Sequence, residues 1–405
     1  MTPEVKKRIE QIRQGIVPEG YKKTKSDIVP VDWKESSIGE YICEYTEKTT
    51  IPNQYPVLTS ARTGLMLQTD YYSNRQVTTE NNVGYNILPF GYVTFRSRSD
   101  DGRFRFNENR IIKRGIISYF YPVFSFSEEV CHEYMLYLLN FSIYRRMFPY
   151  AEGTAQQVLS LKKLGQLKYS LPPVTEQKKI AEILSTQDKA IELQGRKIEE
   201  LKRFKKGCLE KMFPRKGQKV PEKRFPGFTD DWEQRKLGEV FNFHYGDGNN
   251  NPSNGGQYPV FGAGGIQGRY TKYNAENSII IGHMGDAGCV SWGEGKHFVT
   301  YNGTITTPKD DVFTAKFGYY LLLNMNLRKY RGGSGLPFLT YDMLTEMETK
   351  CPNSKIETQE IADYFTQLDH LITLHQRKLE EMKRQKKALM QLLLTGIVKT
   401  KGEVR

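Results

Sequence analysis

The chain has little cysteine and no long apolar run. Its 405 residues include only five cysteines, and they lie far apart: Cys43, Cys131, Cys208, Cys289 and Cys351. Without a Cys-x-x-Cys pair, neither a zinc site nor a disulfide framework is indicated. No apolar stretch approaches the roughly 18 residues that a membrane-spanning helix needs. The opening MTPEVKKRIEQIRQG lacks the apolar core of a signal peptide and favours a short helix, capped by Thr2 and ended at Gly15.

Acidic residues are in deficit. Lys and Arg number 59 against 46 Asp and Glu, which gives a formal net charge of +13 and a pI of about 9.2. This balance favours an acidic partner, such as nucleic acid or an anionic membrane surface, although a solvated basic surface has the same composition. The scattered cysteines are typical of a reducing compartment, so we expect a cytoplasmic protein.

One long basic helix occurs twice in the sequence. It is expected over Thr175–Phe213 and again over Ser354–Leu394, each time after a globular segment. Ile180-Ala181 returns as Ile361-Ala362, and this offset of 181 residues (361 − 180) holds along both helices. A repeat of this length indicates a duplicated unit of one globule and one helix.

The globular segments, or heads, repeat more loosely. Asp32-Trp33 corresponds to Asp231-Trp232 at an offset of 199 (231 − 32). Short runs of β-branched and aromatic residues, broken by Gly, Pro and Asn, predict strands. Helical spacing of apolar residues predicts short helices at 132–140 and 317–326. We therefore expect an α+β protein with two pseudo-repeated, mixed α/β heads.

Apolar residues in both long helices follow a four-three spacing, which is the pattern of a coiled-coil seam. In the first helix they include Ile180, Leu184, Ile191, Ile198 and Leu201. In the second they include Ile361, Phe365, Leu368, Ile372, Leu379 and Met382. Lys205 and Lys386 interrupt the two stripes at the same place. The spacing predicts an antiparallel pair of helices, and docking of each stripe on its own head is the alternative.

Motifs of nucleotide-binding and methyl-transfer enzymes are missing or incomplete. The sequence contains no P-loop and no Asn-Pro-Pro-aromatic motif. The glycine-rich run 262–268 leads into Arg269-Tyr270-Thr271 without a helical period, whereas a dinucleotide-binding loop needs a helix after it. His283 and His297 flank Cys289, but nothing near this cysteine indicates an activated thiolate.

One pattern supports an alternative as a metal-dependent nuclease. Asp286, Glu294 and Lys296 are spaced as Asp-x7-Glu-x-Lys. Two carboxylates and a lysine can hold a divalent ion and activate water. The pattern is short, common by chance, and has no counterpart in the first head. A metal-dependent nicking assay with a Glu294→Ala control separates this alternative from a binding function.

Basic and polar loops are the candidate DNA-binding residues. In the first head these are Arg62, Arg96, Arg98, Arg103, Arg105 and Thr154. In the second they are His244, Tyr245, Asn249, Asn250, Gln267, Arg269, His283 and Ser334. Arginine clamps phosphates and reads guanine, whereas Asn and Gln can pair with adenine. The hydroxyls of Thr154 and Ser334 stand in matching Gly-Thr and Gly-Ser turns and can hold a phosphate. Solvated hairpins and ordinary turns are the alternatives.

These patterns resemble the specificity subunits of type I restriction–modification systems. The resemblance is carried by Arg224–Val240, by Leu171–Leu184 with its counterpart Cys351–Phe365, and by the tails RKIEELKRFKK and RKLEEMKRQKK. It covers the whole chain in the order head, helix, head, helix. The first head departs from the usual opening, and the usual glutamine after the Gly-Thr turn is Gln156 in the first head but Leu336 in the second.

The resemblance implies a function without catalysis in this chain. Each head would read one half of a split, asymmetric DNA sequence, and the paired helices would set the gap. The helices would also dock two adenine methyltransferase subunits that bind S-adenosylmethionine. A restriction subunit would use ATP and Mg²⁺. A coiled-coil scaffold without DNA contact remains a further alternative, which salt-dependent DNA binding would exclude.

The repeat and its breaks predict the domain boundaries. In order they are an N-terminal helix and extension (1–26), a first target recognition domain (27–173), a central long helix (174–213), a linker (214–225), a second target recognition domain (226–353), a C-terminal long helix (354–396) and a tail (397–405).

Overall fold

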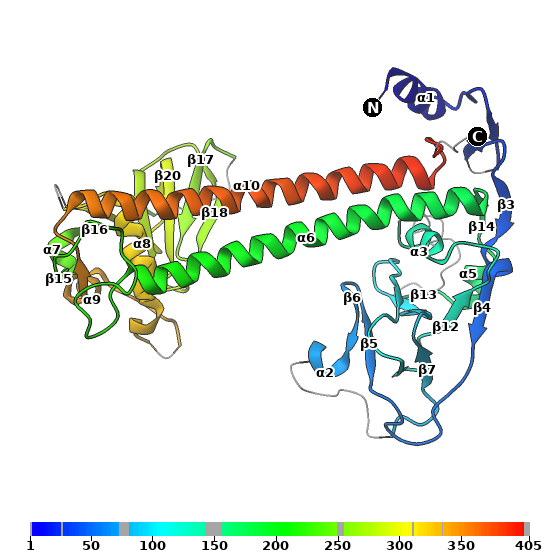
Figure 1. The fold of residues 1–405 in the computed structure, drawn as a ribbon, viewed down its shortest axis with the longest axis horizontal. Helices are drawn as coiled ribbons and strands as arrows, with labels where there is room; N and C mark the ends of the chain where they lie inside the picture. Colours follow the sequence, from blue (N-terminus) through cyan, green and yellow to red (C-terminus); the bar gives the residue numbers. More distant parts are fainter. Residues whose placement is uncertain are drawn as a thin grey trace. The chain divides into compact units, whose positions relative to one another are not determined.

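The computed structural model describes residues 2–25, 27–72, 81–141, 156–248, 255–309, 312–333 and 335–400. The chain divides into two compact units, of which unit 1 is Met1–Glu192 with Glu380–Arg405 and unit 2 is Leu193–Leu379. Each unit therefore holds one head and a segment of both long helices (Figure 1).

The predicted N-terminal helix is confirmed as α1 (Pro3–Arg13). The Thr2 hydroxyl accepts a hydrogen bond from the Val5 amide at 3.4 Å, which satisfies one of the free amides of the first turn. Gly15 has a φ of +76°, the left-handed conformation that commonly follows a helix end. A short antiparallel hairpin follows, made of β1 (Tyr21–Lys23) and β2 (Ile28–Pro30).

This N-terminal extension binds the tail that follows the second long helix. The Ile397 carbonyl accepts hydrogen bonds from Arg8 Nη1 at 3.1 Å and from Tyr21 Oη at 3.0 Å. Lys399 Nζ lies 2.6 Å from an oxygen of Asp32. The two ends of the chain are thus held together within unit 1.

A four-stranded antiparallel sheet forms the centre of the first head, with the order β10-β8-β12-β4. Its strands are β4 (Ile42–Tyr45), β8 (Val93–Phe95), β10 (Phe106–Glu108) and β12 (Val123–Phe126). Four strand pairs surround it: β3 (Lys34–Ser37) with β14 (Lys168–Leu171), β5 (Leu58–Ala61) with β6 (Gly64–Leu67), β7 (Asn86–Pro89) with β11 (Arg114–Ile117), and β9 (Arg98–Ser99) with β13 (Gln157–Val158). The helical segments are η1 (Ile38–Tyr41), α2 (Gln68–Tyr71), α3 (His132–Phe141) and α5 (Leu161–Gly165). Tyr134 and Leu138 of α3 pack with Phe106 and Phe124 of the sheet in one core.

The second head contains a six-stranded sheet with the order β16-β21-β19-β20-β17-β18. Its strands are β16 (Phe241–Tyr245), β17 (Tyr258–Gly262), β18 (Gly265–Tyr270), β19 (Ala275–Gly282), β20 (Val290–Val299) and β21 (Gly303–Pro308). A separate pair joins β15 (Glu233–Lys236) to β22 (Glu348–Cys351). The helical segments are α7 (Leu237–Val240), α8 (Ala315–Met325), η3 (Leu327–Tyr330) and α9 (Tyr341–Glu346). The two heads are mixed α/β, as predicted.

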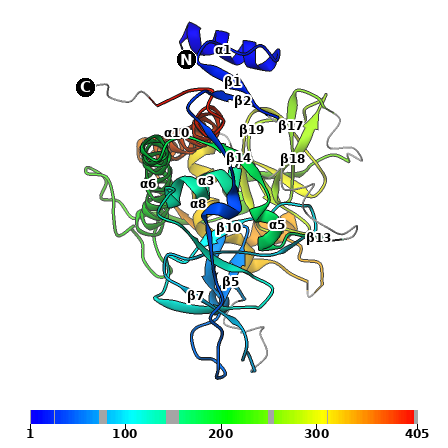
Figure 2. The same ribbon diagram turned by 90° about the vertical axis from the view of Figure 1, so that its right-hand side faces the viewer.

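The long helices are α6 (Val174–Met212) and α10 (Lys355–Leu394). They lie side by side (Figure 1, Figure 2) and run antiparallel. Asp188 in the first half of α6 contacts Lys386 in the second half of α10. Lys205 in the second half of α6 contacts Asp369 in the first half of α10. Within the described part of the chain, no helix is long and apolar enough to span a membrane.

The apolar stripes pair with the opposite helix, as predicted, and they also dock on the heads, which was the alternative. Every predicted seam residue is buried or half-buried. Ile180 and Leu184 share a core with α3 of the first head and with Leu393 of α10. In unit 2, Phe365 packs with the second head and with Met212 of α6. The ends of each stripe therefore pair with the other helix and also complete a head.

The repeated Asp-Trp motif anchors each head to the start of its long helix. Trp33 Nε1 donates to Glu176 Oε2 at 3.3 Å in unit 1, and Trp232 Nε1 donates to Glu357 Oε1 at 3.3 Å in unit 2. Both indole rings are almost fully buried. A buried indole N–H needs an acceptor, and the first-turn glutamate of the helix supplies it in both units. This contact gives the sequence repeat its physical reason.

Candidate nucleic-acid interface

All five arginines singled out in the first head line one cavity of about 360 Å³: Arg62, Arg96, Arg98, Arg103 and Arg105. They come from the turn after β5, the segment after β8, strand β9 and the loop before β10. Tyr71, Tyr72 and Tyr121 contribute aromatic rings to the same cavity. The fold thus gathers the basic side chains beside aromatic rings, which is the combination that nucleic-acid surfaces use.

One carboxylate organises two of these arginines. Arg62 Nη2 lies 2.8 Å from Asp101 Oδ1, and Arg103 Nε lies 3.9 Å from Asp101 Oδ2. Desolvation acts to raise the pKa of Asp101, but hydrogen bonds from the Arg103 amide, the Ser99 hydroxyl and Arg62 outweigh it and lower that pKa. The two arginine side chains remain 66% and 68% exposed.

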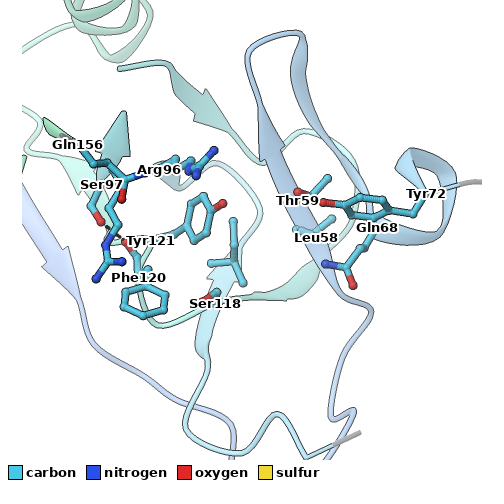
Figure 3. Close-up of a pocket in the computed structure, with 12 residues that line it drawn as sticks. Leu58, Thr59, Gln68, Tyr72, Arg96, Ser97, Ser118, Phe120, Tyr121 and Gln156 are labelled. Atoms are coloured by element: carbon cyan, nitrogen blue, oxygen red, sulfur yellow. Dashed lines mark hydrogen bonds between the residues drawn. The ribbon is translucent and has the colours of Figure 1, made fainter. Parts of the chain in front are cut away.

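A second cavity, of about 400 Å³, adjoins the first and shares Arg96, Arg98 and Tyr72 with it (Figure 3). The Arg98 guanidinium lies 4.6 Å from the centroid of the Phe120 ring, a cation–π contact that orients it. Gln156 also lines this cavity and donates to Asp100 Oδ1 at 2.8 Å. Figure 3 shows Arg96, Gln156 and Tyr121 on one side of the cavity and Tyr72 with Gln68 on the other.

In the second head, a group of aromatic rings surrounds the predicted Tyr245. The Tyr245 ring centroid lies 4.4 Å from the His283 ring and 5.0 Å from the Tyr341 ring. His283 Nδ1 lies 2.9 Å from the Leu339 carbonyl oxygen, and because a carbonyl oxygen only accepts, Nδ1 is the donor in this contact. Tyr245 and Tyr341 remain 38% and 42% exposed. His244 precedes Tyr245 on β16, and its side chain points to the opposite face of that strand.

Gln267 and Arg269 belong to a different part of the second head. Both lie on β18, which stands at the opposite end of the strand order from β16. Arg269 donates to the carbonyls of Gly256 (3.0 Å) and Gln257, so it closes a loop next to its own strand. The Gln267 side chain lies against Gly262 in the β17–β18 hairpin. The structure therefore does not bring these two residues to the Tyr245 group.

The glycine-rich run 262–268 spans the end of β17, a tight turn at 263–264 and the start of the antiparallel strand β18. No helix follows it, which agrees with the rejection of a dinucleotide-binding loop. His297 is fully buried and hydrogen-bonded to Ser278 Oγ at 2.9 Å, and burial lowers its pKa. The predicted residues Thr154, Asn249, Asn250 and Ser334 lie outside the described residues.

The residues of the nuclease alternative contact three different partners. Asp286 pairs with Arg328 at 2.8 Å. Glu294 pairs with Lys316 at 3.2 Å, and hydrogen bonds from Trp292 and Lys316 lower the pKa of its carboxyl. Lys296 Nζ lies 4.5 Å from the centroid of the Tyr273 ring. Among the residues that the structure describes, no three His, Cys, Asp or Glu side chains are grouped to hold a metal ion. These contacts oppose a metal-dependent nuclease site.

Several aromatic residues of these surfaces are not predicted from the sequence, among them Tyr72, Tyr121 and Tyr341. Tyr72 and Tyr121 reach the arginine cavities from segments distant from the arginine-rich run. Tyr341 follows the Gly-Ser turn of the second head by several residues and meets Tyr245 only in the fold. Each stands outside any basic or polar motif, so no local signal in the sequence marks it.

Comparisons with known proteins point to one family. The model of the "Type I restriction modification DNA specificity domain" matches residues 30–203 and again residues 229–384. A putative type I restriction enzyme MjaX specificity subunit of Methanocaldococcus jannaschii is 28% identical over 291 residues, which cover 66% of this chain and 68% of that protein. The MjaVIII specificity subunit of the same organism is 25% identical, over 62% of this chain and 67% of its own length.

Solved structures share the fold. The type I restriction–modification S subunit from M. genitalium has a TM-score of 0.58 at 18% identity and covers 96% of this chain and 100% of its own. A chain from a structure on complex assembly and conformational transition of the type I R-M system has a TM-score of 0.57 at 15% identity and covers 91% and 99%. Because the family model matches both halves of the repeat, this chain belongs to the family of type I restriction–modification DNA specificity subunits.

Proposed function

We propose that this chain reads a split, asymmetric DNA sequence, with one half-site for each head. The observation that carries the proposal is the contrast between two heads on one repeated frame. The first presents five arginines around a cavity. The second presents Tyr245, His283 and Tyr341 as a cluster of rings. Different side chains on equivalent heads fit different half-sites, and the net charge of +13 fits the phosphate backbone.

The paired helices set the gap between the half-sites in this proposal. A helix of the 39 residues of α6 is on the order of 58 Å long at about 1.5 Å per residue. Neighbouring half-sites on one face of DNA are about 34 Å apart or a multiple of that distance. A rod of this length is therefore suited to hold two reading surfaces at a fixed separation.

Catalysis belongs to partner subunits in this account. Two adenine methyltransferase subunits dock on the helices and bind S-adenosylmethionine, and restriction subunits bind ATP and Mg²⁺. In this proposal the chain reads the DNA, and the partner subunits carry out the chemistry. The complex acts on chromosomal DNA and is expected in the cytoplasm, at the nucleoid.

The test is a map of methylated adenines in the host, by long-read sequencing, with and without the gene. We expect deletion to abolish methylation at one split, asymmetric motif and to leave other motifs unchanged. Re-expression of the chain restores the motif. Loss of no motif, in a host that expresses the chain and a methyltransferase subunit, would contradict the proposal.

A further inference from the structure

Polar residues stand in or beside the apolar seam at three positions, and these positions are the same in both long helices. Asp188, Gln194 and Lys205 lie on α6, and Asp369, His375 and Lys386 lie on α10. Each pair of counterparts is 181 residues apart, which is the offset of the whole helix repeat. Polar residues in a seam cost stability, so their repetition calls for a physical reason.

The three positions contact one another across the helix pair. Lys386 Nζ lies 2.5 Å from Asp188 Oδ1 in unit 1. Lys205 Nζ lies 2.6 and 2.8 Å from the two oxygens of Asp369 in unit 2. The central pair joins equivalent residues, because Gln194 Nε2 lies 2.9 Å from His375 Nδ1 and donates to the His375 carbonyl at 2.8 Å. Each charged residue thus contacts a residue of opposite charge, and the central Gln194 contacts His375, its equivalent in the repeat.

Each ion pair is also bound by a tyrosine from the head of its unit. Tyr137 of α3 donates to Asp188 Oδ2 at 2.7 Å, and Tyr320 of α8 donates to Asp369 Oδ2 at 2.9 Å. The ammonium groups of the paired lysines lie 5.3 and 5.2 Å from the centroids of these rings. Burial, together with the adjacent aspartate, raises the pKa of both phenols, so they remain donors. The same three-part contact therefore occurs independently in both units.

This arrangement distinguishes the observed pairing from its competitors. In a parallel pair, equivalent positions would face each other, and Asp188 would meet Asp369 while Lys205 met Lys386. An antiparallel slip by one heptad would place Lys205 opposite Ala362 or Gln376. The same slip would place Lys386 opposite Ala181 or Gly195. All of these alternatives leave the lysines, whose side chains are only 13% and 21% exposed, without a carboxylate.

We infer that the two Lys–Asp–Tyr contacts and the Gln194–His375 contact fix the direction and register of the helix pair, and join each head to that register. They are positioning residues for the gap between half-sites, and the inference rests on the proposed function. A slip of one heptad is about 10.5 Å along the helix. That distance equals about three base-pair steps of 3.4 Å. The register therefore controls the gap directly.

The experiment replaces both ion pairs with apolar side chains, so that no charged group is left without its partner. The apolar variant combines Asp188→Leu, Lys205→Met, Asp369→Leu and Lys386→Met in the full chain. The matched control combines Lys202→Met and Lys383→Met. These lysines of the same helices are 48% and 52% exposed and pair with Glu199 and Glu380 on their own helices. The gene is replaced in the host, and adenine methylation is mapped.

We expect the apolar variant to keep both half-sites but to lose selectivity for the gap. The ratio of methylation at the native gap to methylation at longer or shorter gaps should fall at least about tenfold. The control should keep the native ratio. An apolar variant that folds and retains the native gap alone would overturn the inference. Absence of any split motif with the unmodified chain would instead contradict the proposed function.

A second pair of variants tests the contact in the purified chain, independently of methylation. Lys205→Asp places two carboxylates together and should lower the melting temperature. Adding Asp369→Lys exchanges the two charges and should recover most of the lost melting temperature. If the exchange brings no recovery, the ion pair does not hold the register, and the inference fails even where the apolar variant does not fold.

Discussion

Arg224 binds Glu357 through two parallel hydrogen bonds, Nε to Oε1 at 2.6 Å and Nη2 to Oε2 at 2.8 Å. The Glu357 side chain is 1% exposed and also accepts from the Trp232 indole. The linker between the first long helix and the second head thus supplies the cation that neutralises a buried carboxylate. In unit 1 the equivalent carboxylate, Glu176, accepts from the backbone amide of Thr400, at 3.2 Å, and from the Trp33 indole.

Arg224→Ala should destabilise unit 2, because it leaves the Glu357 charge buried with a single indole donor. The expected loss in the free energy of unfolding is on the order of 3 kcal/mol. Urea unfolding followed by tryptophan fluorescence measures it. Lys219→Ala is the matched control, since Lys219 pairs with Asp231 at the surface and both side chains are more than half exposed. The control should change the free energy of unfolding little, because solvent screens an exposed ion pair. Equal unfolding midpoints for the two variants would show that the Arg224–Glu357 contact stabilises unit 2 no more than an exposed ion pair does.

Glu176→Gln and Glu357→Gln should act in opposite directions at neutral pH. Burial raises the pKa of Glu176, and the hydrogen bonds from Thr400 and Trp33 only partly oppose it. The folded state therefore binds this proton more tightly than the unfolded state does. The cost to folding is present above the folded pKa and disappears as the pH falls below the unfolded value. Glu176→Gln should then raise the melting temperature at pH 7 and change it little near pH 4. Glu357→Gln should lower it at pH 7, because Arg224 loses its carboxylate.

Differential scanning calorimetry of both variants across that pH range is the measurement. A melting temperature that falls for Glu176→Gln at pH 7 would show that the ionised carboxylate stabilises unit 1, against this account.

The double variant Arg96→Ala with Arg98→Ala should weaken DNA binding mainly through lost phosphate contacts. If each arginine neutralises one phosphate, the slope of log affinity against log salt should become shallower by about 0.9 for each, or about 1.8 in total. Fluorescence anisotropy with a duplex of the methylated motif, over a salt series, measures the slope. Lys202→Ala on the exposed face of α6 is the control and should leave the slope unchanged. A double variant with the unmodified slope would place the phosphate contacts elsewhere in the first head.

Tyr341→Ala should relax recognition of one half-site only. The Tyr341 ring packs on Tyr245, which packs on His283. Loss of the Tyr341 ring therefore removes a support of the Tyr245–His283 pair, which we propose faces the bases. We expect methylation at sites altered in the half read by the second head to rise about tenfold relative to the native sequence, which corresponds to about 1.4 kcal/mol of lost discrimination. Tyr330→Ala is the control, because this tyrosine of the same head is 52% exposed and lies in η3. Equal effects of the two substitutions would remove the specific role of Tyr341.

The sequence predicts the repeated frame of this protein well, because the signals are local and periodic. The four-three spacing and the flanking breaks mark both long helices, and Thr2 marks the cap of α1. The interruptions at Lys205 and Lys386 are also visible in the sequence. Their partners are not, since Asp188 and Asp369 lie on the other helix and Tyr137 and Tyr320 come from the heads. The repeat shows which residues of the two helices correspond, but not which residues of distant elements touch.

In the candidate interface, too, local patterns are predicted from the sequence and contacts between distant segments are not. The arginines of the first head are predicted because most of them fall in one short run, and the fold does bring them to one cavity. In the second head, sequence reasoning groups Gln267 and Arg269 with His283 by residue type alone. The strand order separates them, because β18 and β16 stand at opposite ends of the sheet. Side-chain chemistry identifies candidate residues, but only the pairing of strands decides which of them meet.

The central claim is that each head reads its own half-site, and replacing the reading loop of one head tests it most directly. In the host gene, residues 96–105 are exchanged for the corresponding loop of a family member with a different motif, and methylated adenines are mapped by long-read sequencing. The account predicts a motif with one half-site changed, the other half-site intact and the gap unchanged. A motif changed in both halves, or an unchanged motif from a chain that is expressed and folded, would contradict it.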